Sequence, residues 1–118
     1  MYDSSNIFAK ILREEISCDK IYEDNFALAF NDINPQAKKH VLIIPKGAYI
    51  DLKDFSERAS SEEILGFYRA IGEVAELIQA TQKGFRIISN QGLDGGQEVP
   101  HFHIHLLAGE KLKGLLVK

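Results

Sequence analysis

The chain has 118 residues, a length at which a single domain buries its own core, and we expect residues 1–118 to form one domain. Its 45% hydrophobic and 26% charged residues are typical of a globular protein, and its net charge of −3 argues against an extended basic surface for nucleic acid. There is no apolar run of the roughly 20 residues that span a bilayer, no signal-peptide pattern and only one cysteine, Cys18, so we expect a cytoplasmic protein without disulfides, bound to neither nucleic acid nor membrane.

The spacing of apolar residues predicts helices and strands in chain order. A short amphipathic helix over residues 7–12 follows an N-cap at Ser4 or Ser5. A turn at residues 24–25 joins the first two strands as a hairpin. The predicted strands are residues 20–23, 26–30, 40–45, 85–90 and the segment 100–107. Because the connections are short, we expect an antiparallel sheet in an α+β domain.

The longest apolar pattern predicts a helix over residues 62–82. Ser60 and Glu63 form a capping box at its start, and Gly84 is well placed just after its end. Apolar residues also lie off the main stripe, which indicates that a second face of this helix is covered. Near the end of the chain, the apolar residues 115–117 need a buried position.

Three of the four histidines alternate with apolar residues near the C-terminal end. The period of two predicts a strand that directs Phe102, Ile104 and Leu106 into a core. The opposite face then carries His101, His103 and His105. This row has three interpretations: a solvated strand face, a metal site, or a catalytic row in which one imidazole attacks while its neighbours orient it or move protons.

Other polar groups could share a site with this row. The loop before it, residues 91–100, contains three glycines, whose backbone N–H groups can turn toward a bound anion. His40 opens the apolar central strand, and Asn90 ends the strand before the loop. For the metal interpretation, Glu98 or Asp94 would have to supply a further ligand. That interpretation leaves the glycine loop unexplained and ranks second.

Residues 101–107 match the His-φ-His-φ-His-φ-φ signature of the histidine-triad (HIT) superfamily, where φ is an apolar residue. Residues 7–11, 29–37, 40–46 and 90–97 also resemble the Hint branch of that superfamily, so the resemblance covers nearly the whole chain. It implies a five-stranded antiparallel sheet with two helices. It also implies a homodimer in which the long helix and a strand pair two protomers into a ten-stranded sheet.

The resemblance implies a purine nucleoside phosphoramidase, which binds a purine nucleoside monophosphate or its phosphoramidate and hydrolyses the P–N bond without a cofactor or metal. His103 would be the nucleophile that becomes nucleotidylated, His101 and His105 would bond to the phosphate and the surroundings of the nucleophile, and His40 would orient the triad. Phosphate contacts would come from Asn90, Gly96, Gln97, Glu98 and Val99 together with His103 and His105. The nucleoside would lie against Ile7, Phe8, Ile11, Phe30, Asp32 and Ile33.

The chain departs from the family pattern at three places. Glu98 stands where many Hint proteins have Ser or Thr, so a hydroxyl donor to phosphate is missing. Asn6 and Ala9 occupy the places of a Cys-x-x-Cys pair that binds zinc in some bacterial relatives, so we expect no such zinc. The tail is short and lacks the tryptophan-containing end that shapes leaving-group selectivity in animal members. Two alternatives stay open: a dinucleoside polyphosphate hydrolase, as in the Fhit branch, and a nucleotide-binding interaction module with little turnover.

Overall fold

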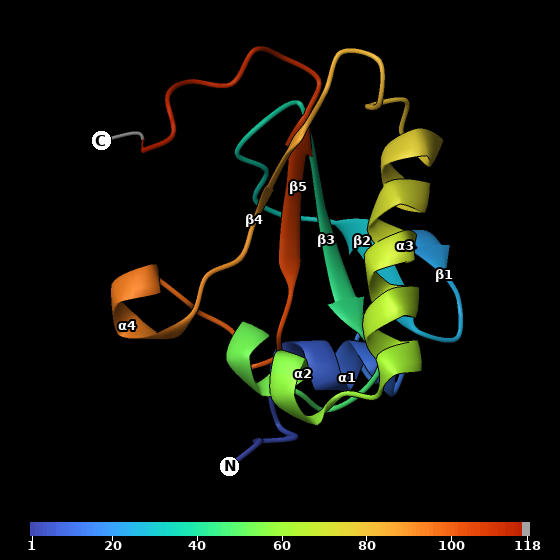
Figure 1. The fold of residues 1–118 in the computed structure, drawn as a ribbon, viewed down its shortest axis with the longest axis vertical. Helices are drawn as coiled ribbons and strands as arrows, with labels where there is room; N and C mark the ends of the chain where they lie inside the picture. The colour runs from blue at the N-terminus through green and yellow to red at the C-terminus, as the bar shows by residue number, and fades with distance from the viewer. Residues whose placement is uncertain (117–118) are drawn as a thin grey trace.

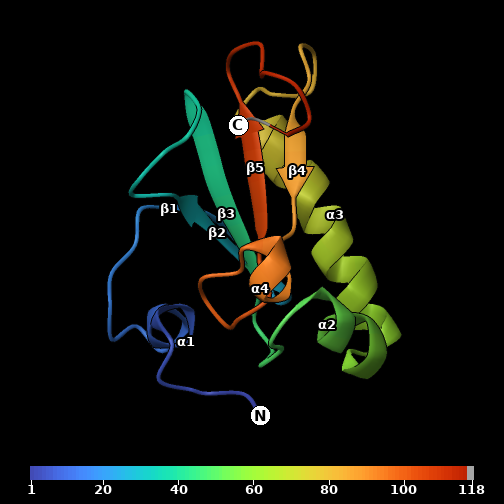
Figure 2. The same cartoon turned by 90° about the vertical axis from the view of Figure 1, so that its left-hand side faces the viewer.

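The computed structural model describes residues 1–116. Five strands form one antiparallel sheet in the order β1-β2-β3-β5-β4, which confirms the predicted sheet. Figures 1 and 2 show α3 along one face of this sheet and α1 near one end of the other. The elements are α1 (Ile7–Leu12), β1 (Lys20–Glu23), β2 (Ala27–Asn31), β3 (Lys39–Pro45), α2 (Leu52–Arg58), α3 (Ser61–Leu77), β4 (Arg86–Ile88), α4 (Gly92–Gly95) and β5 (Ile104–Ala108).

The central strands β2 and β3 are buried on both faces because two separate clusters of apolar side chains pack against them. The larger cluster joins Ala27, Ala29, Val41 and Ile43 to Phe67, Ile71 and Val74 of α3. The smaller cluster joins Leu28, Phe30, Leu42 and Ile44 to Phe8 and Ile11 of α1. Alternate residues of one strand therefore serve different cores, as the two-residue period of a strand requires.

The long helix α3 starts as predicted and ends earlier. The Ser60 and Glu63 side chains each bond the other's backbone N–H, which confirms the capping box. The helix ends at Leu77, because Gln79 takes a left-handed conformation (φ 60°) and the backbone N–H of Ala80 bonds back to the Ala75 carbonyl. The predicted end near residue 82 was wrong, and Gly84 lies in the following loop. A Schellman-type end on a glutamine gives no clear sequence signal.

Other local predictions also need correction. The N-cap of α1 is Asn6, whose Oδ1 accepts the N–H of Ala9 at 2.9 Å, rather than Ser4 or Ser5. The structure adds the short helices α2 and α4, which span too few turns for an apolar period to identify. β4 covers only Arg86–Ile88 of the expected strand 85–90, and β2 begins at Ala27, one residue after the predicted start.

Two leucines of the segment after β5 lie at the surface. Leu115 and Leu116 are 87% and 81% exposed, against the expectation that they are covered, and Val117 lies outside the described residues. Among residues 1–116, no helix has the length and apolar character needed to cross a membrane.

Candidate active site

The histidine segment leads into β5, and the rings of His101 and His103 lie against Phe8 of α1. Phe102, Ile104 and Leu106 belong to the larger core, which confirms the predicted alternation. The predicted length of the strand was wrong, because β5 begins only at Ile104. The ladder between β3 and β5 stops at the pair Ile43–Ile104, and beyond it the His101 ring bonds the Pro45 carbonyl in place of a backbone partner.

The His101 ring is fully buried, and both of its nitrogens are bonded. Nε2 lies 2.9 Å from the Pro45 carbonyl oxygen, and Nδ1 lies 2.6 Å from the Tyr2 hydroxyl. A carbonyl only accepts, so Nε2 carries the ring proton and Nδ1 accepts from Tyr2. Burial lowers the pKa of His101 to about 4, although the Pro45 bond acts in the opposite direction. This arrangement leaves no ring nitrogen of His101 for a phosphate oxygen.

His103 is oriented by the backbone of His101. Its Nδ1 lies 2.7 Å from the His101 carbonyl oxygen, so Nδ1 carries the proton and Nε2 keeps a lone pair. The ring is buried and packs edge-on against Phe8, with the ring centroids 5.0 Å apart. Burial lowers the pKa of His103, against the opposing effect of the His101 carbonyl. A neutral imidazole with a free lone pair is the form that can attack an electrophile.

A chain of hydrogen bonds fixes the proton on His105. The backbone N–H of Gln36 donates to His40 Nδ1 at 3.0 Å, so the proton of His40 is on Nε2. That nitrogen is 2.9 Å from His105 Nδ1, which therefore accepts and leaves the His105 proton on Nε2. Burial lowers the pKa of His40, and burial followed by the neighbouring imidazoles lowers that of His105 to about 4. The site thus combines the lone pair of His103 with a ring N–H donor.

The Asp32 carboxylate lies beside this chain. Its Oδ2 is 3.4 Å from His40 Nε2, and its Oδ1 accepts the backbone N–H of Asn34 at 2.8 Å. Its negative charge opposes the lowering of the pKa of His40 and His105. Asp32 therefore belongs to the histidine site in the structure, where the sequence resemblance assigned it only to the nucleoside.

The residues predicted to hold the nucleoside lie in two kinds of surroundings. Phe8, Ile11 and Phe30 are buried together in the smaller core, and the rings of Phe8 and Phe30 pack edge to face at 5.7 Å. Ile7 and Ile33 are 44% and 97% exposed. The buried part gives an apolar wall next to His103, whereas the exposed part has apolar surface available for a ligand.

The glycine loop before the histidines is held by its own side chains. Asn90 donates to the Gly95 carbonyl at 2.6 Å, and Gln97 donates to the Ile50 and Val99 carbonyls at 2.7 and 3.1 Å. The backbone N–H groups of Gly96 and Gln97 bond within the loop, to Leu93 and Gly92.

Backbone donors of this loop stay available on the side of the histidines. Within residues 1–116, none of the described hydrogen bonds uses the N–H of Glu98 or Val99, so both can donate to an anion. The Glu98 side chain is exposed, and its charge is one of the smaller effects that raise the pKa of His103.

The donor set of the histidine site does not suit a resident metal ion. Among the described residues, ligand atoms of Asp32, His40 and His105 lie within 4.8 Å of one another. A metal ligand must present a lone pair, and for His40 Nε2 to do so the proton would have to move to Nδ1. There it would face the N–H of Gln36, which already donates to that atom.

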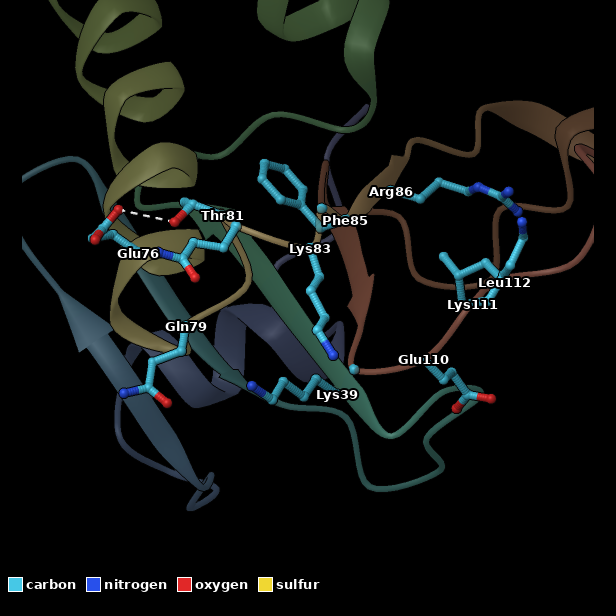
Figure 3. Close-up of a pocket in the computed structure, with 13 residues that line it drawn as sticks. Lys39, Glu76, Gln79, Thr81, Lys83, Phe85, Arg86, Glu110, Lys111 and Leu112 are labelled. Carbon is cyan, nitrogen blue, oxygen red and sulfur yellow. Dashed lines mark hydrogen bonds between the residues drawn. The ribbon is translucent and has the colours of Figure 1, made fainter.

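A large hollow lies away from the histidines (Figure 3). It has a volume of about 1200 Å³ at the end of α3, and it includes Lys39, Lys83, Arg86 and Lys111 together with Glu76 and Glu110. No histidine lines it. Lys39 pairs with Ala108, the last residue of β5, whereas His103 precedes the first, so the hollow lies toward the opposite end of that strand. Volume alone therefore does not identify the candidate active site.

Sequence reasoning missed three groups that orient the histidines: the Tyr2 hydroxyl, the Gln36 N–H and the Pro45 carbonyl. Two of these are backbone atoms, which carry no side-chain signal. Tyr2 is 99 positions away from its partner, His101, and no local pattern links the two residues.

Comparison with known proteins adds four findings. The model of the HIT domain family matches residues 13–112. The chain is 56% identical to an uncharacterized 13.2 kDa HIT-like protein of Azospirillum brasilense, with 99% of this chain and 96% of the relative covered. It is 42% identical to the purine nucleoside phosphoramidase of Escherichia coli K12, over 93% of this chain and 92% of that protein. The structure of a HIT family hydrolase from Clostridium thermocellum superposes with a TM-score of 0.88 and 35% identity, covering 98% of this chain and 99% of that one.

Proposed function

The chain belongs to the HIT domain family, and on that premise we propose that it is a purine nucleoside phosphoramidase acting through a nucleotidyl-histidine intermediate. Its substrate would be a nucleoside 5′-monophosphate joined to an amine through a P–N bond. The observation that carries the proposal is the orientation of His103, whose Nδ1–H is held 2.7 Å from the His101 carbonyl so that Nε2 is the free nucleophile.

In the first step, His103 Nε2 attacks the phosphorus atom. A bond forms between Nε2 and phosphorus, and the P–N bond to the amine breaks, so the departing nitrogen must gain one proton. We assign that proton to His105, which takes up a second proton from solvent when the substrate binds and becomes neutral as it gives a proton to the amine. An anionic phosphoryl group beside this ring raises its proton affinity above that of the ligand-free protein, and the Asp32 carboxylate acts in the same direction.

In the second step, water attacks the same phosphorus atom. His105, now neutral, takes a proton from the water, the bond from phosphorus to His103 Nε2 breaks, and the nucleoside monophosphate leaves. The histidines then regain their protonation state in the substrate complex, and one P–N bond has been exchanged for one P–O bond. The two steps use His103, His105, one water molecule and the proton taken up from solvent, with the loop N–H groups of Glu98 and Val99 stabilising charge on the phosphoryl oxygens.

The walls of the site suit a nucleoside next to the phosphoryl group. Phe8 packs against both His103 and Phe30, so an apolar surface continues from the nucleophile into the smaller core. A flat purine ring is attracted to such a wall, and the Asp32 carboxylate can accept bonds from ribose hydroxyls. We therefore keep Ile7, Ile11 and Ile33, with Phe8, Phe30 and Asp32, as the proposed nucleoside contacts.

The test is release of AMP from an adenosine 5′-phosphoramidate of a simple alkylamine, in the presence of a chelator. We expect turnover by the wild type, and none above background by His103→Ala. Rapid acid-free quenching followed by mass spectrometry should detect one AMP adduct on the wild-type chain and none on the variant. Equal rates for the two proteins would refute the mechanism.

Other results would identify a different function. Turnover of a diadenosine polyphosphate with no turnover of the phosphoramidate would favour the dinucleoside polyphosphate hydrolase. Tight AMP binding without turnover of either substrate would favour a binding module.

We further propose that two copies pair through β4 into a ten-stranded sheet. β4 is an edge strand of the sheet, and its Ile87 and Ile88 are 41% and 36% exposed. An edge strand with apolar side chains is a template for pairing with another strand. Light scattering should give twice the chain mass for the wild type and the mass of one chain for Ile88→Lys. Ile16→Lys is the matched control, since Ile16 is 37% exposed and far from this edge in the chain.

A further inference from the structure

The N-terminal segment reaches into the histidine site through Tyr2. The Tyr2 hydroxyl lies 2.6 Å from His101 Nδ1, and the two rings pack edge to face with their centroids 5.6 Å apart. His101 is fully buried and Tyr2 is half-buried, so this hydrogen bond is largely removed from water. A bond in such surroundings orients its partners more strongly than one at the surface.

The chemistry of His101 requires a donor at this position. Its Nε2–H is directed to the Pro45 carbonyl at 2.9 Å, so Nδ1 has a lone pair and can only accept. Without the Tyr2 hydroxyl, that lone pair would be buried and unsatisfied, which is costly. The energy of the unsatisfied lone pair would then favour a displaced His101 ring, or a ring whose proton has shifted to Nδ1 with loss of the bond to Pro45.

Movement of His101 would also change the position of His103, the proposed nucleophile. The carbonyl of His101 accepts the Nδ1–H of His103 at 2.7 Å, and the N–H of His101 bonds the Val99 carbonyl at 2.9 Å. His101 is therefore held at its ring and at its backbone, and its carbonyl decides which nitrogen of His103 keeps the lone pair.

The segment that carries Tyr2 is itself fixed to α1. The Asn6 side chain donates to the Asp3 carbonyl at 2.8 Å while it caps the helix through Ala9. Asp3 in turn accepts the N–H and hydroxyl of Ser5. The turn over residues 3–6 thus holds Tyr2 at a set distance from the helix whose Phe8 packs on the histidine rings.

We propose that Tyr2 is a positioning residue of the active site: its hydroxyl fixes the ring of His101, and the His101 carbonyl then fixes the orientation of His103. This inference rests on the proposed function, in which His103 is the nucleophile. Tyr2 itself touches no reacting atom. It acts by keeping the population of correctly oriented His103 high, so its loss should change the rate of the chemical step and leave substrate binding nearly unchanged.

The test compares the wild type with Tyr2→Phe, Tyr2→Ala and a control, Tyr22→Phe. The control also removes one tyrosine hydroxyl from a hydrogen bond, because Tyr22 donates to Asp24 at 2.8 Å in β1. The substrate is the adenosine phosphoramidate used above, and the full chain carries no added residues before Met1.

We expect Tyr2→Phe to lower kcat about fivefold to tenfold, the effect of losing one net hydrogen bond, with KM within about twofold of the wild type. Tyr22→Phe should keep the wild-type kcat. If only the packing of the ring mattered, Tyr2→Ala would be slow and Tyr2→Phe would match the wild type, and that result would overturn the proposal.

A second readout does not depend on turnover. Long-range ¹H–¹⁵N spectra of the histidine rings should place the wild-type His101 proton on Nε2 and that of His103 on Nδ1. In Tyr2→Phe the ring signals of both residues should shift or broaden, whereas Tyr22→Phe should leave them in place. Unchanged ring signals in Tyr2→Phe would overturn the proposal. If the wild type hydrolyses no phosphoramidate, the proposed function fails, and these spectra still decide whether Tyr2 orients the two histidines.

Discussion

Acid should destabilise the fold through one buried imidazole, that of His101. The ring is 0% exposed, and its burial lowers the pKa to about 4 from the ordinary value of 6.5, which it regains in the unfolded chain. Between these two values the unfolded chain binds more protons than the native protein does. The free energy of unfolding is therefore highest above pH 6.5 and decreases as the pH falls through this window.

The size of the loss follows from the two pKa values. Each tenfold change in proton affinity is worth roughly 1.4 kcal/mol, so the full gap for His101 corresponds to about 3 kcal/mol. Between pH 7.5 and pH 4.5, about 2.5 kcal/mol of this would be lost, a large share of the roughly 5–15 kcal/mol by which domains are stable. Burial also lowers the pKa of His105 to about 4, and this ring, which is partly exposed, adds a smaller loss of the same sign.

The assay is urea denaturation of the wild type and of His101→Gln at pH 7.5 and pH 4.5. All samples have the same protein concentration, because association of two chains would shift the midpoint. Glutamine does not titrate, and the carboxylates contribute equally to both proteins. We expect the wild type to lose about 2.5 kcal/mol more than the variant between the two pH values. Equal losses would refute the argument that the His101 ring is held neutral by burial.

Three further predictions follow from the same structure. Because burial lowers the pKa of His103, kcat/KM measured from pH 4.5 to 8 should fall on the acid side with a midpoint below 6.5, and a midpoint at or above 6.5 would contradict this. His40→Asn should lower kcat about tenfold at nearly constant KM, because His105 loses the His40 donor that keeps its proton on Nε2. An unchanged kcat would exclude this role of His40. Gly66→Ala should reduce stability by about 1–3 kcal/mol in thermal unfolding, since the added Cβ would clash with the ring of Phe26. Its control is Gly72→Ala in the same helix, where a Cβ meets no atom within 4 Å, and equal stability of the two variants would contradict the clash.

The features that the sequence predicted are those that repeat along the chain. The alternation in residues 101–107 gave the two faces of the histidine segment, and the capping box at Ser60 gave the start of α3. These signals are local, since each depends on residues a few positions apart. The end of α3 on Gln79 was not predicted, because a left-handed glutamine is uncommon and depends on the burial of Ala80 next to it.

The candidate site was predicted as a set of residues and not as an arrangement of protons. The resemblance grouped His40 with the triad, and the structure adds that it donates to His105 while accepting from the backbone. The proton positions depend on the Pro45 carbonyl and the Gln36 N–H, which any residue type would provide at those places. Which backbone atom lies next to which imidazole ring depends on the fold, so the proton positions could not be predicted from the sequence.

The orientation of these hydrogen bonds explains how four neighbouring histidines produce two different chemical groups. Each imidazole here is neutral and has one proton and one lone pair to place. His101 and His40 use both nitrogens on neighbours within the protein, and so carry no free group themselves. The backbone carbonyl of His101 accepts the Nδ1–H of His103, which leaves the lone pair of His103 Nε2 free. The ring of His40 donates to Nδ1 of His105, which leaves the Nε2–H of His105 free. The result is one free lone pair and one free N–H side by side, with the ring centroids of His103 and His105 5.1 Å apart, so that the proposed nucleophile lies next to the ring to which we assign proton transfer once the substrate has bound.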